Sequence, residues 1–400
     1  MKILMINSVC GVKSTGRICT DLAVQLKKRG HTVRIAYGRG SVPDKFALIS
    51  FRIGNDLDVN LHGCHARIFD DSGFGSKKAT KDFISWVEKY DPDVIHLHNI
   101  HGYYLNIQIL FDYLQHAKKR IVWTLHDCWP FTGHCCYFDF AKCDKWREQC
   151  HHCPQKKDYP ASIFFDHSHE NQKKKKELFS GIANMTLVTP SAWLASLVQD
   201  SFLRQYPIYT IPNWVNLNTF SFTPSNFRKR YGITKEYIVL GVASVWDRRK
   251  GLDVFIKIEK ILGSSYQIVL VGLTKKQLEQ LPEGIIGITH TSSERELAEI
   301  YSAADVFVNP THEDNYPATH LEAIACGTPV ISFDVGGCGE SASLYGATVP
   351  DNDIICLTER IQQISKGKIT FSMPNLEAAN LSSYEMYFQL LEGKKIEESI

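Results

Sequence analysis

Short apolar runs alternate with amphipathic stretches along most of the chain. Residues 2–7 form a β-rich run, residues 17–29 carry apolar side chains at helical spacing as far as Gly30, and residues 32–37 form the next β-rich run. A strand, a glycine-containing loop, a helix and a second strand make the opening of a nucleotide-binding α/β fold. The alternation resumes at residue 237. The pattern therefore predicts parallel sheets covered by helices.

The most informative stretch lies in the second half of the chain. An apolar run at 306–309 leads into the acidic loop 313–317, and a short helix carrying Glu322 follows and ends at Gly327. A further apolar run completes a βαβ unit, whose loop and helix start face a ligand. Backbone N–H groups at a helix start suit a pyrophosphate. We expect Asp314 and Glu322 to accept hydrogen bonds from sugar hydroxyls; an acidic loop that only caps a helix is the alternative interpretation.

Two histidines of the first half follow predicted strands. His98 ends the run 94–97, and His126 follows the run 121–125. The carboxyl ends of parallel strands share one edge of a sheet, and such folds bind ligands there. A lone histidine is more often a structural residue, but two at one predicted edge favour a binding site.

A group of cysteines follows the second histidine. A C-x-x-C pair with further cysteines or histidines within about 20 residues fits tetrahedral zinc. The predicted ligands are Cys135, Cys143, Cys150 and Cys153, with Cys136, His134, His151 or His152 as substitutes. Residues 127–165 look too polar to bury much core, which favours a structural metal over a catalytic one. Free thiols in a loop are the alternative.

Length and charge narrow the class of protein. The 400 residues suit two domains, and a net charge of +2 argues against a nucleic-acid partner. Apolar runs stay below the roughly 18 residues of a transmembrane helix, and the N-terminal run is too short for a signal peptide. Twelve cysteines without a secretory signal indicate a reducing compartment, so we expect a cytoplasmic protein. Four lysines at 173–176 predict either peripheral contact with anionic lipid at the inner face of the membrane or a solvated helix face.

Together these stretches resemble the retaining glycosyltransferases of family 4. Asp314 and Glu322, with seven residues between them, resemble the two-carboxylate signature of that family, and Lys250 resembles its phosphate-binding lysine. The first carboxylate of the family is usually Glu, so either Glu313 or Asp314 contacts the donor sugar. The histidine and cysteine motifs resemble a bacterial polysaccharide-assembly subgroup of the colanic-acid type.

One position departs from the family pattern. The family has an arginine five residues before its lysine, and Val245 stands there in this chain. Two cations suit a diphosphate better than one. Arg248 or Arg249 either replaces the missing arginine or is surface charge.

The resemblance implies an α/β protein of the GT-B fold, with two Rossmann-like domains facing across a cleft. It implies an acceptor-side domain at 1–208 with a cysteine-rich insertion at about 133–160. A nucleotide-sugar-binding domain follows at 209–375, and a helix at 376–400 packs back on the first domain.

The resemblance also implies an activity. A sugar moves from a nucleoside-diphosphate sugar to a glycan or lipid-linked oligosaccharide acceptor, with retention of configuration, in bacterial surface polysaccharide synthesis. His126, with His98 as second choice, supports the sugar, and the donor-binding candidates are Gly16, Arg249, Lys250, Glu313, Asn315, Tyr316 and Pro317. Lys250 and the helix dipoles stabilise the negative charge of the leaving group, so we expect no catalytic metal. The alternatives are a non-catalytic carbohydrate-binding relative, a nucleotide-sugar epimerase and a nucleic-acid-binding zinc protein.

Overall fold

The chain divides into two compact α/β units. The computed structural model describes residues 1–394 and residue 396. The first unit holds Met1–Pro212 and the chain from Ser382 on, and the second holds Asn213–Leu381. The predicted boundaries at 208 and 375 lie close to these divisions. Within the predicted segment 376–400, residues 395 and 397–400 lie outside the described residues.

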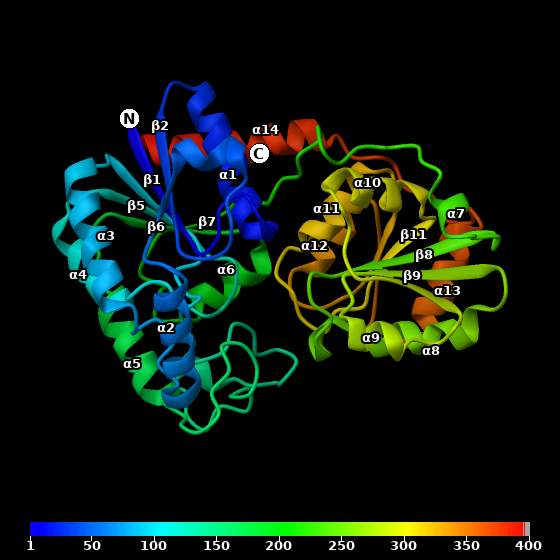
Figure 1. The fold of residues 1–400 in the computed structure, drawn as a ribbon, viewed down its shortest axis with the longest axis horizontal. Coiled ribbons are helices and arrows are strands. Elements are labelled where there is room, and N and C mark those ends of the chain that lie inside the picture. Colours follow the sequence, from blue (N-terminus) through cyan, green and yellow to red (C-terminus); the bar gives the residue numbers. More distant parts are fainter. Residues whose placement is uncertain (395, 397–400) are drawn as a thin grey trace. The chain divides into compact units, whose positions relative to one another are not determined.

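A seven-stranded parallel sheet forms the centre of the first unit, with helices on both faces (Figure 1). The strand order is β3-β2-β1-β4-β5-β6-β7. The strands are β1 (Lys2–Asn7), β2 (Thr32–Tyr37), β3 (Ser50–Arg52), β4 (Val94–Leu97), β5 (Arg120–Thr124), β6 (Met185–Thr189) and β7 (Ile208–Thr210). The helices are α1 (Lys13–Lys28), α2 (Asp56–Phe69), α3 (Lys77–Tyr90), α4 (Ile107–His116), α5 (Ser168–Phe179), α6 (Ala192–Gln199) and most of α14 (Leu376–Glu392), with 3₁₀ turns η1 (Asp44–Ile49) and η2 (Lys145–Arg147).

A six-stranded parallel sheet of order β10-β9-β8-β11-β12-β13 forms the centre of the second unit. The strands are β8 (Tyr237–Val242), β9 (Tyr266–Val271), β10 (Ile285–Ile288), β11 (Val306–Asn309), β12 (Val330–Phe333) and β13 (Gly346–Val349). The helices are α7 (Phe227–Arg230), η3 (Arg248–Lys250), α8 (Leu252–Leu262), α9 (Lys275–Glu279), α10 (Glu294–Ala303), α11 (Ala318–Ala325), α12 (Cys338–Ala342) and α13 (Ile354–Ser365). Helices α10, α11 and α12 cover one face of this sheet, and α8, α9 and α13 cover the other (Figure 1).

The order of the strands predicts where each unit binds a ligand. The first sheet reverses its direction of growth between β1 and β4, and the second does so between β8 and β11. Open parallel sheets bind ligands beyond the carboxyl ends of their strands at this switch point. His98 directly follows β4, and residues 310–317 follow β11. His98 and the acidic loop therefore lie at switch points, and His126 follows β5, the neighbour of β4.

The structure corrects three expectations about the first unit. Helix α1 begins at Lys13, not at residue 17, so Gly16 lies in its first turn. The cysteine-rich stretch is not too polar for the core, because Phe131, Phe138 and Trp146 are at most 4% exposed. These aromatic residues follow no regular period, so the sequence pattern does not reveal their burial. Finally, Lys175 of the lysine run is buried and not solvated.

The C-terminal helix α14 packs on the first unit from Ser382 on. The Tyr387 hydroxyl lies 3.0 Å from the Thr124 hydroxyl at the end of β5, and Arg120 donates to the Leu391 carbonyl oxygen at 2.9 Å. Among the described residues, no helix is long and apolar enough to cross a membrane.

Candidate functional site

In the second unit, the short turn η3 is fastened to the acidic loop after β11. The Arg249 carbonyl oxygen accepts the His312 N–H at 2.8 Å, and the Arg249 guanidinium donates to the Glu313 carbonyl oxygen at 2.8 Å. A side chain at Gly251 would meet the Pro310 carbonyl oxygen at 2.1 Å, so only glycine allows this approach of the two loops. At the switch point, Arg249 and Lys250 of the loop after β8 thus lie against the acidic loop after β11.

Lys250 and Asp314 form an ion pair at this place. Burial opposes ionisation of Asp314, but the charges of Lys250 and Arg249, together with the Asn315 N–H at 2.9 Å, lower its pKa to about 2. The pair stays open to a ligand, because the side chains of Lys250 and Asp314 are 20% and 15% exposed. Arg249 lies beside Lys250 and provides a second positive charge there. In the family pattern that charge comes from an arginine at the position that Val245 occupies in this chain.

Helix α11 carries the second carboxylate. Glu322 is buried, and the Tyr301 hydroxyl of α10 donates to it at 3.1 Å. His320, also buried, contacts Asn309 and Ser341 at 2.8 Å each, and burial lowers its pKa to about 3. The predicted strand–loop–helix–strand unit is confirmed: β11 and β12 are parallel neighbours, and Gly327 ends the helix with φ +86°.

The remaining donor-binding candidates follow Asp314 in the loop before α11. Asn315 and Tyr316 are buried, and Pro317 is the N-cap of the helix. Behind them, Gly337 N–H donates to the Asp314 carbonyl oxygen at 3.1 Å, and a side chain at Gly336 would meet that oxygen at 2.1 Å. The glycine turn therefore packs directly against the acidic loop.

In the first unit, the two predicted histidines are in contact. His98 Nδ1 lies 3.0 Å from His126 Nε2, and their rings stack with centroids 5.3 Å apart. Burial lowers the pKa of His126 to about 4 and that of His98 well below its ordinary value. His98 Nε2 is buried without a hydrogen-bond partner. The pair is therefore neutral near pH 7 and offers hydrogen bonds rather than charge.

Sequence reasoning missed the third member of this group. His96 lies in β4 on the same face as His98, with ring centroids 4.1 Å apart, and its Nε2 lies 2.9 Å from the Thr124 hydroxyl. Residues two apart in a strand share a face, so the alternation His96-Leu97-His98 was the available signal. Gly16, in the first turn of α1, lies against the loop after β1, where its carbonyl oxygen accepts the Gly11 N–H at 3.1 Å.

The four predicted thiol ligands lie in one loop, and a zinc ion on them stays a prediction. The Cys135 thiol donates to Cys153, which lowers the pKa of Cys153 and raises that of Cys135. The Gly133 N–H lies 3.3 Å from the Cys150 sulfur, and Cys143 is only partly buried. Among the described residues, a different set brings three ligand atoms within 4.8 Å of one another: His101, Asp127 and Cys136.

Comparison with known proteins shows the class to which this fold belongs. Two family models match the chain, one described as Glycosyltransferase Family 4 over residues 15–219 and one as Glycosyl transferases group 1 over residues 236–366. The fold is that of the GT-B glycosyltransferases. The chain belongs to glycosyltransferase family 4, and it is a glycosyltransferase.

Individual relatives agree with this assignment. The chain is 25% identical over 289 residues to the putative colanic acid biosynthesis glycosyl transferase WcaC of Escherichia coli K12, covering 70% of this chain and 68% of WcaC. Two further curated relatives match over less than half of their own length.

Solved structures are similar in fold. Sucrose-phosphate synthase of Thermosynechococcus elongatus aligns with a TM-score of 0.69 at 17% identity, covering 98% of this chain and 100% of the synthase. HepE of Anabaena in complex with UDP-glucose aligns with a TM-score of 0.61 at 14% identity, covering 97% of this chain and 100% of HepE.

Proposed function

We propose that this glycosyltransferase moves a sugar from a nucleoside-diphosphate sugar to a glycan or lipid-linked oligosaccharide, with retention of anomeric configuration, in bacterial surface polysaccharide synthesis. The observation that carries the proposal is the group of Lys250, Arg249 and Asp314 at the switch point of the six-stranded sheet. Two neighbouring cations match a diphosphate. Further support comes from the similarity to WcaC and from the UDP-glucose bound in HepE.

Each group of the second unit has a role in the proposed reaction. When the bond from the anomeric carbon to the diphosphate breaks, negative charge grows on the leaving nucleoside diphosphate. Lys250, Arg249 and the N–H groups at the start of α11 stabilise that charge, so the proposal requires no divalent ion. Glu313 or Asp314 orients the sugar hydroxyls, and Glu322 holds the ribose.

His126 supports the sugar and does not act as the base. A histidine whose pKa is about 4 holds a proton poorly at neutral pH. The acceptor hydroxyl forms the new bond to the anomeric carbon, and its proton leaves with the nucleoside diphosphate. The neutral imidazole then contributes a hydrogen bond to the donor sugar.

The test is a donor screen followed by product analysis. Thermal shift with a panel of nucleoside-diphosphate sugars selects the donor, and chromatography then measures nucleoside diphosphate released with and without glycan acceptors. We expect acceptor-dependent release and a product whose anomeric configuration, read by NMR, equals that of the donor. An inverted product contradicts retention. A donor that is isomerised without transfer identifies an epimerase, and binding without any turnover identifies a non-catalytic relative.

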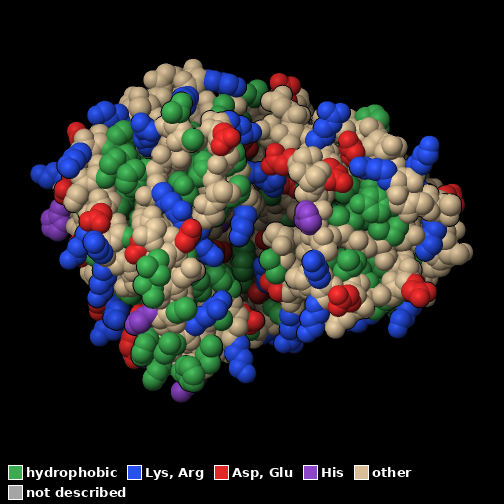
Figure 2. All heavy atoms as spheres, in the orientation of Figure 1, with side chains coloured by type: hydrophobic (Ala, Val, Ile, Leu, Met, Phe, Trp, Pro, Cys, Tyr) green, Lys and Arg blue, Asp and Glu red, His purple; other side chains and the backbone are tan. Residues whose placement is uncertain are grey.

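We further propose that the first unit touches the membrane that holds a lipid-linked acceptor. Hydrophobic side chains gather on the surface over α2 and the adjoining loop (Figure 2). Ile163 and Phe165 pair through their N–H groups with the carbonyl oxygens of Arg67 and Ile68 at the end of α2. Phe164, between them, is 69% exposed, and Lys156 donates to its carbonyl oxygen. Exposed apolar residues beside lysines suit an anionic bilayer.

Vesicle flotation tests this contact. Phe164→Ser should lower co-flotation with phosphatidylglycerol vesicles. Phe222→Ser is the matched control, because Phe222 is 67% exposed in the second unit. If both variants lose co-flotation equally, or if neither loses it, the proposed membrane-contact surface is wrong.

A further inference from the structure

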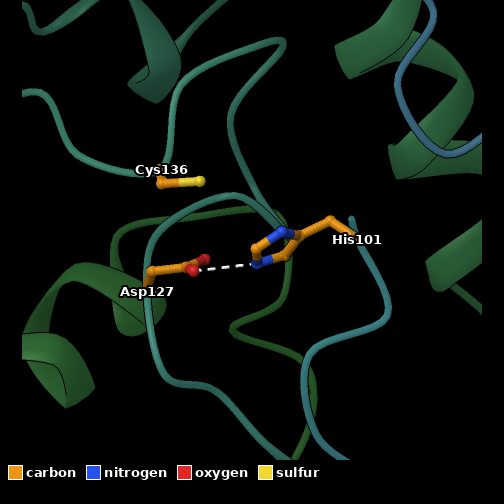
Figure 3. Close-up of side chains that lie close together, drawn as sticks. All are labelled: His101, Asp127 and Cys136. Carbon is orange, nitrogen blue, oxygen red and sulfur yellow. Dashed lines mark hydrogen bonds and ion pairs between the residues drawn. The ribbon is translucent and has the colours of Figure 1, made fainter. Parts of the chain in front are cut away.

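We propose that His101, Asp127 and Cys136 form a binding site for a divalent transition-metal ion of the zinc type. Their ligand atoms, one nitrogen, one oxygen and one sulfur, lie within 4.8 Å of one another. Each residue is 7% exposed, so all three are buried. Figure 3 shows the Cys136 thiol and the Asp127 carboxylate both directed toward the His101 ring.

One pair of ligand atoms is already close to the spacing that a tetrahedral ion requires. Bonds of about 2.0 Å to nitrogen and oxygen and about 2.3 Å to sulfur place the ligand atoms of zinc roughly 3.3–3.6 Å apart, so an ion would also draw in the Cys136 sulfur, which lies within 4.8 Å of the other two atoms. His101 Nε2 and Asp127 Oδ2 are 2.9 Å apart. An ion that takes the place of their shared proton therefore needs only a small separation of the two side chains. A mixed nitrogen, oxygen and sulfur set suits zinc, whereas calcium and magnesium take oxygen ligands.

Neighbouring groups hold the ligands in orientation. His101 Nδ1 lies 3.2 Å from the Tyr159 hydroxyl, which leaves Nε2 for the ion. Asp127 Oδ1 accepts the Trp129 N–H at 3.0 Å, which turns Oδ2 toward His101. Metal-binding histidines and carboxylates in proteins are commonly fixed by such second bonds.

The site would join two segments of the first unit. His101 follows β4, whereas Asp127 and Cys136 both belong to the long loop after β5. In the described chain between β5 and α5, η2 is the only regular element. An ion here would clamp the loop beside the His98–His126 pair, with one coordination position left for water. The site shares no ligand with the four-thiol prediction of Cys135, Cys143, Cys150 and Cys153.

Cobalt titration tests the proposal without any sugar substrate, so its outcome is independent of transferase activity. The full chain is stripped with a chelator, kept reduced without added thiols, and titrated with Co²⁺. Thiolate-to-cobalt absorption reports the number of sulfur ligands. We expect about one ion per chain with the absorption of a single thiolate. Cys136→Ser should abolish that absorption, and Asp127→Asn should weaken binding at least about tenfold.

Cys143→Ser is the matched control, because Cys143 lies in the same loop outside the proposed site. It should leave the cobalt spectrum unchanged. Absence of stoichiometric cobalt binding overturns the site. A spectrum of several thiolates that survives Cys136→Ser and is lost in Cys143→Ser also overturns it and assigns the metal to the four thiols. If circular dichroism shows that Cys136→Ser does not fold, the thiolate count of the wild-type spectrum decides.

Discussion

The two units share one sheet plan and carry opposite chemistry at its switch point. In the second unit the loops after β8 and β11 bring together Lys250, Arg249 and Asp314, a charged group open to solvent. In the first unit the same place holds His98 and His126, which burial keeps neutral. Charge suits a diphosphate, and neutral imidazoles suit hydroxyl groups. Under the proposed function, the scaffold fixes where a ligand binds, while loop residues decide which ligand it is.

The loops also differ in how they are held. The second unit joins β11 to α11 through a short loop pinned by glycines. The first unit carries a long irregular loop after β5, and Lys175 of α5 reaches into it. Lys175 donates to the carbonyl oxygens of Trp129 at 2.8 Å and Thr132 at 3.1 Å, and its ammonium lies 3.5 Å from the centroid of the Trp129 ring.

The first prediction concerns the anchoring of this loop by Lys175. Lys175→Ala removes the donor of two buried carbonyl oxygens and leaves a cavity, so we expect the first unit to lose about 3 kcal/mol of unfolding free energy. Urea unfolding followed by hydrogen exchange assigns the loss to one unit. Lys173→Ala, an exposed neighbour on the same helix, is the control and should change stability by less than about 0.5 kcal/mol. Equal losses of unfolding free energy in the two variants, or a loss in the second unit, contradict the claim that Lys175 anchors the loop after β5.

The second prediction concerns Glu322, the buried carboxylate of the second unit. Glu322→Gln keeps an oxygen for the Tyr301 hydroxyl but removes the charge. We expect the transfer rate to fall about 100-fold, while the unfolding free energy changes by less than about 1 kcal/mol. Tyr301→Phe removes the same hydrogen bond and keeps the charge, so it should retain most activity. If Glu322→Gln transfers sugar normally, Glu322 has a structural role only.

Another expected effect is a difference in acid sensitivity. Burial lowers the pKa of His62 and of His126 to about 4 and that of His96 to about 3, and it lowers that of His98 well below its ordinary value. In the second unit burial lowers the pKa of His320 to about 3. Burial also disfavours the charged form of His134, but the neighbouring carboxylate outweighs it and raises the pKa.

As the pH falls below about 6.5, the unfolded chain binds protons that the folded histidines with lowered pKa do not. Each such histidine then removes about 1.4 kcal/mol of stability per pH unit until its folded pKa is reached, whereas a histidine with raised pKa is protonated in both states below about pH 6.5 and leaves the stability unchanged there. With four lowered pKa values in the first unit and one in the second, the first unit should lose stability faster than the second between about pH 6 and pH 4. Hydrogen exchange in urea at both pH values measures this. An equal or faster loss of stability in the second unit contradicts the assignment of most of the lowered histidine pKa values to the first unit.

Sequence pattern predicted much of this molecule because its signals are local. Buried parallel strands read as apolar runs, helix ends are marked by residues such as Gly327, and the residues after strand ends follow from topology. These signals predicted His98, His126 and the loop with Asp314 as candidate site residues. The contact of the two histidines confirms that they share one edge of the sheet.

The parts that the sequence did not predict depend on long-range contacts. The choice of Arg249 as partner of the acidic loop depends on how two turns 64 residues apart pack together. The burial of Lys175, in a run of four lysines, depends on carbonyl groups of a loop without regular structure. The group of His101, Asp127 and Cys136 joins the loops after β4 and β5, and neither spacing nor periodicity reveals it.

Titration calorimetry with the nucleoside diphosphate selected by the donor screen tests the central claim, that the charged switch point of the second unit holds the donor. Lys250→Ala should weaken binding by about 100-fold, whereas Lys257→Ala, which breaks the Lys257–Asp253 pair on α8, should leave it unchanged. His126→Asn should change the affinity for the nucleotide less than about threefold, because in the proposed reaction the imidazole contacts the sugar and not the phosphates. Unchanged affinity in Lys250→Ala, or a larger loss in His126→Asn, would contradict the account.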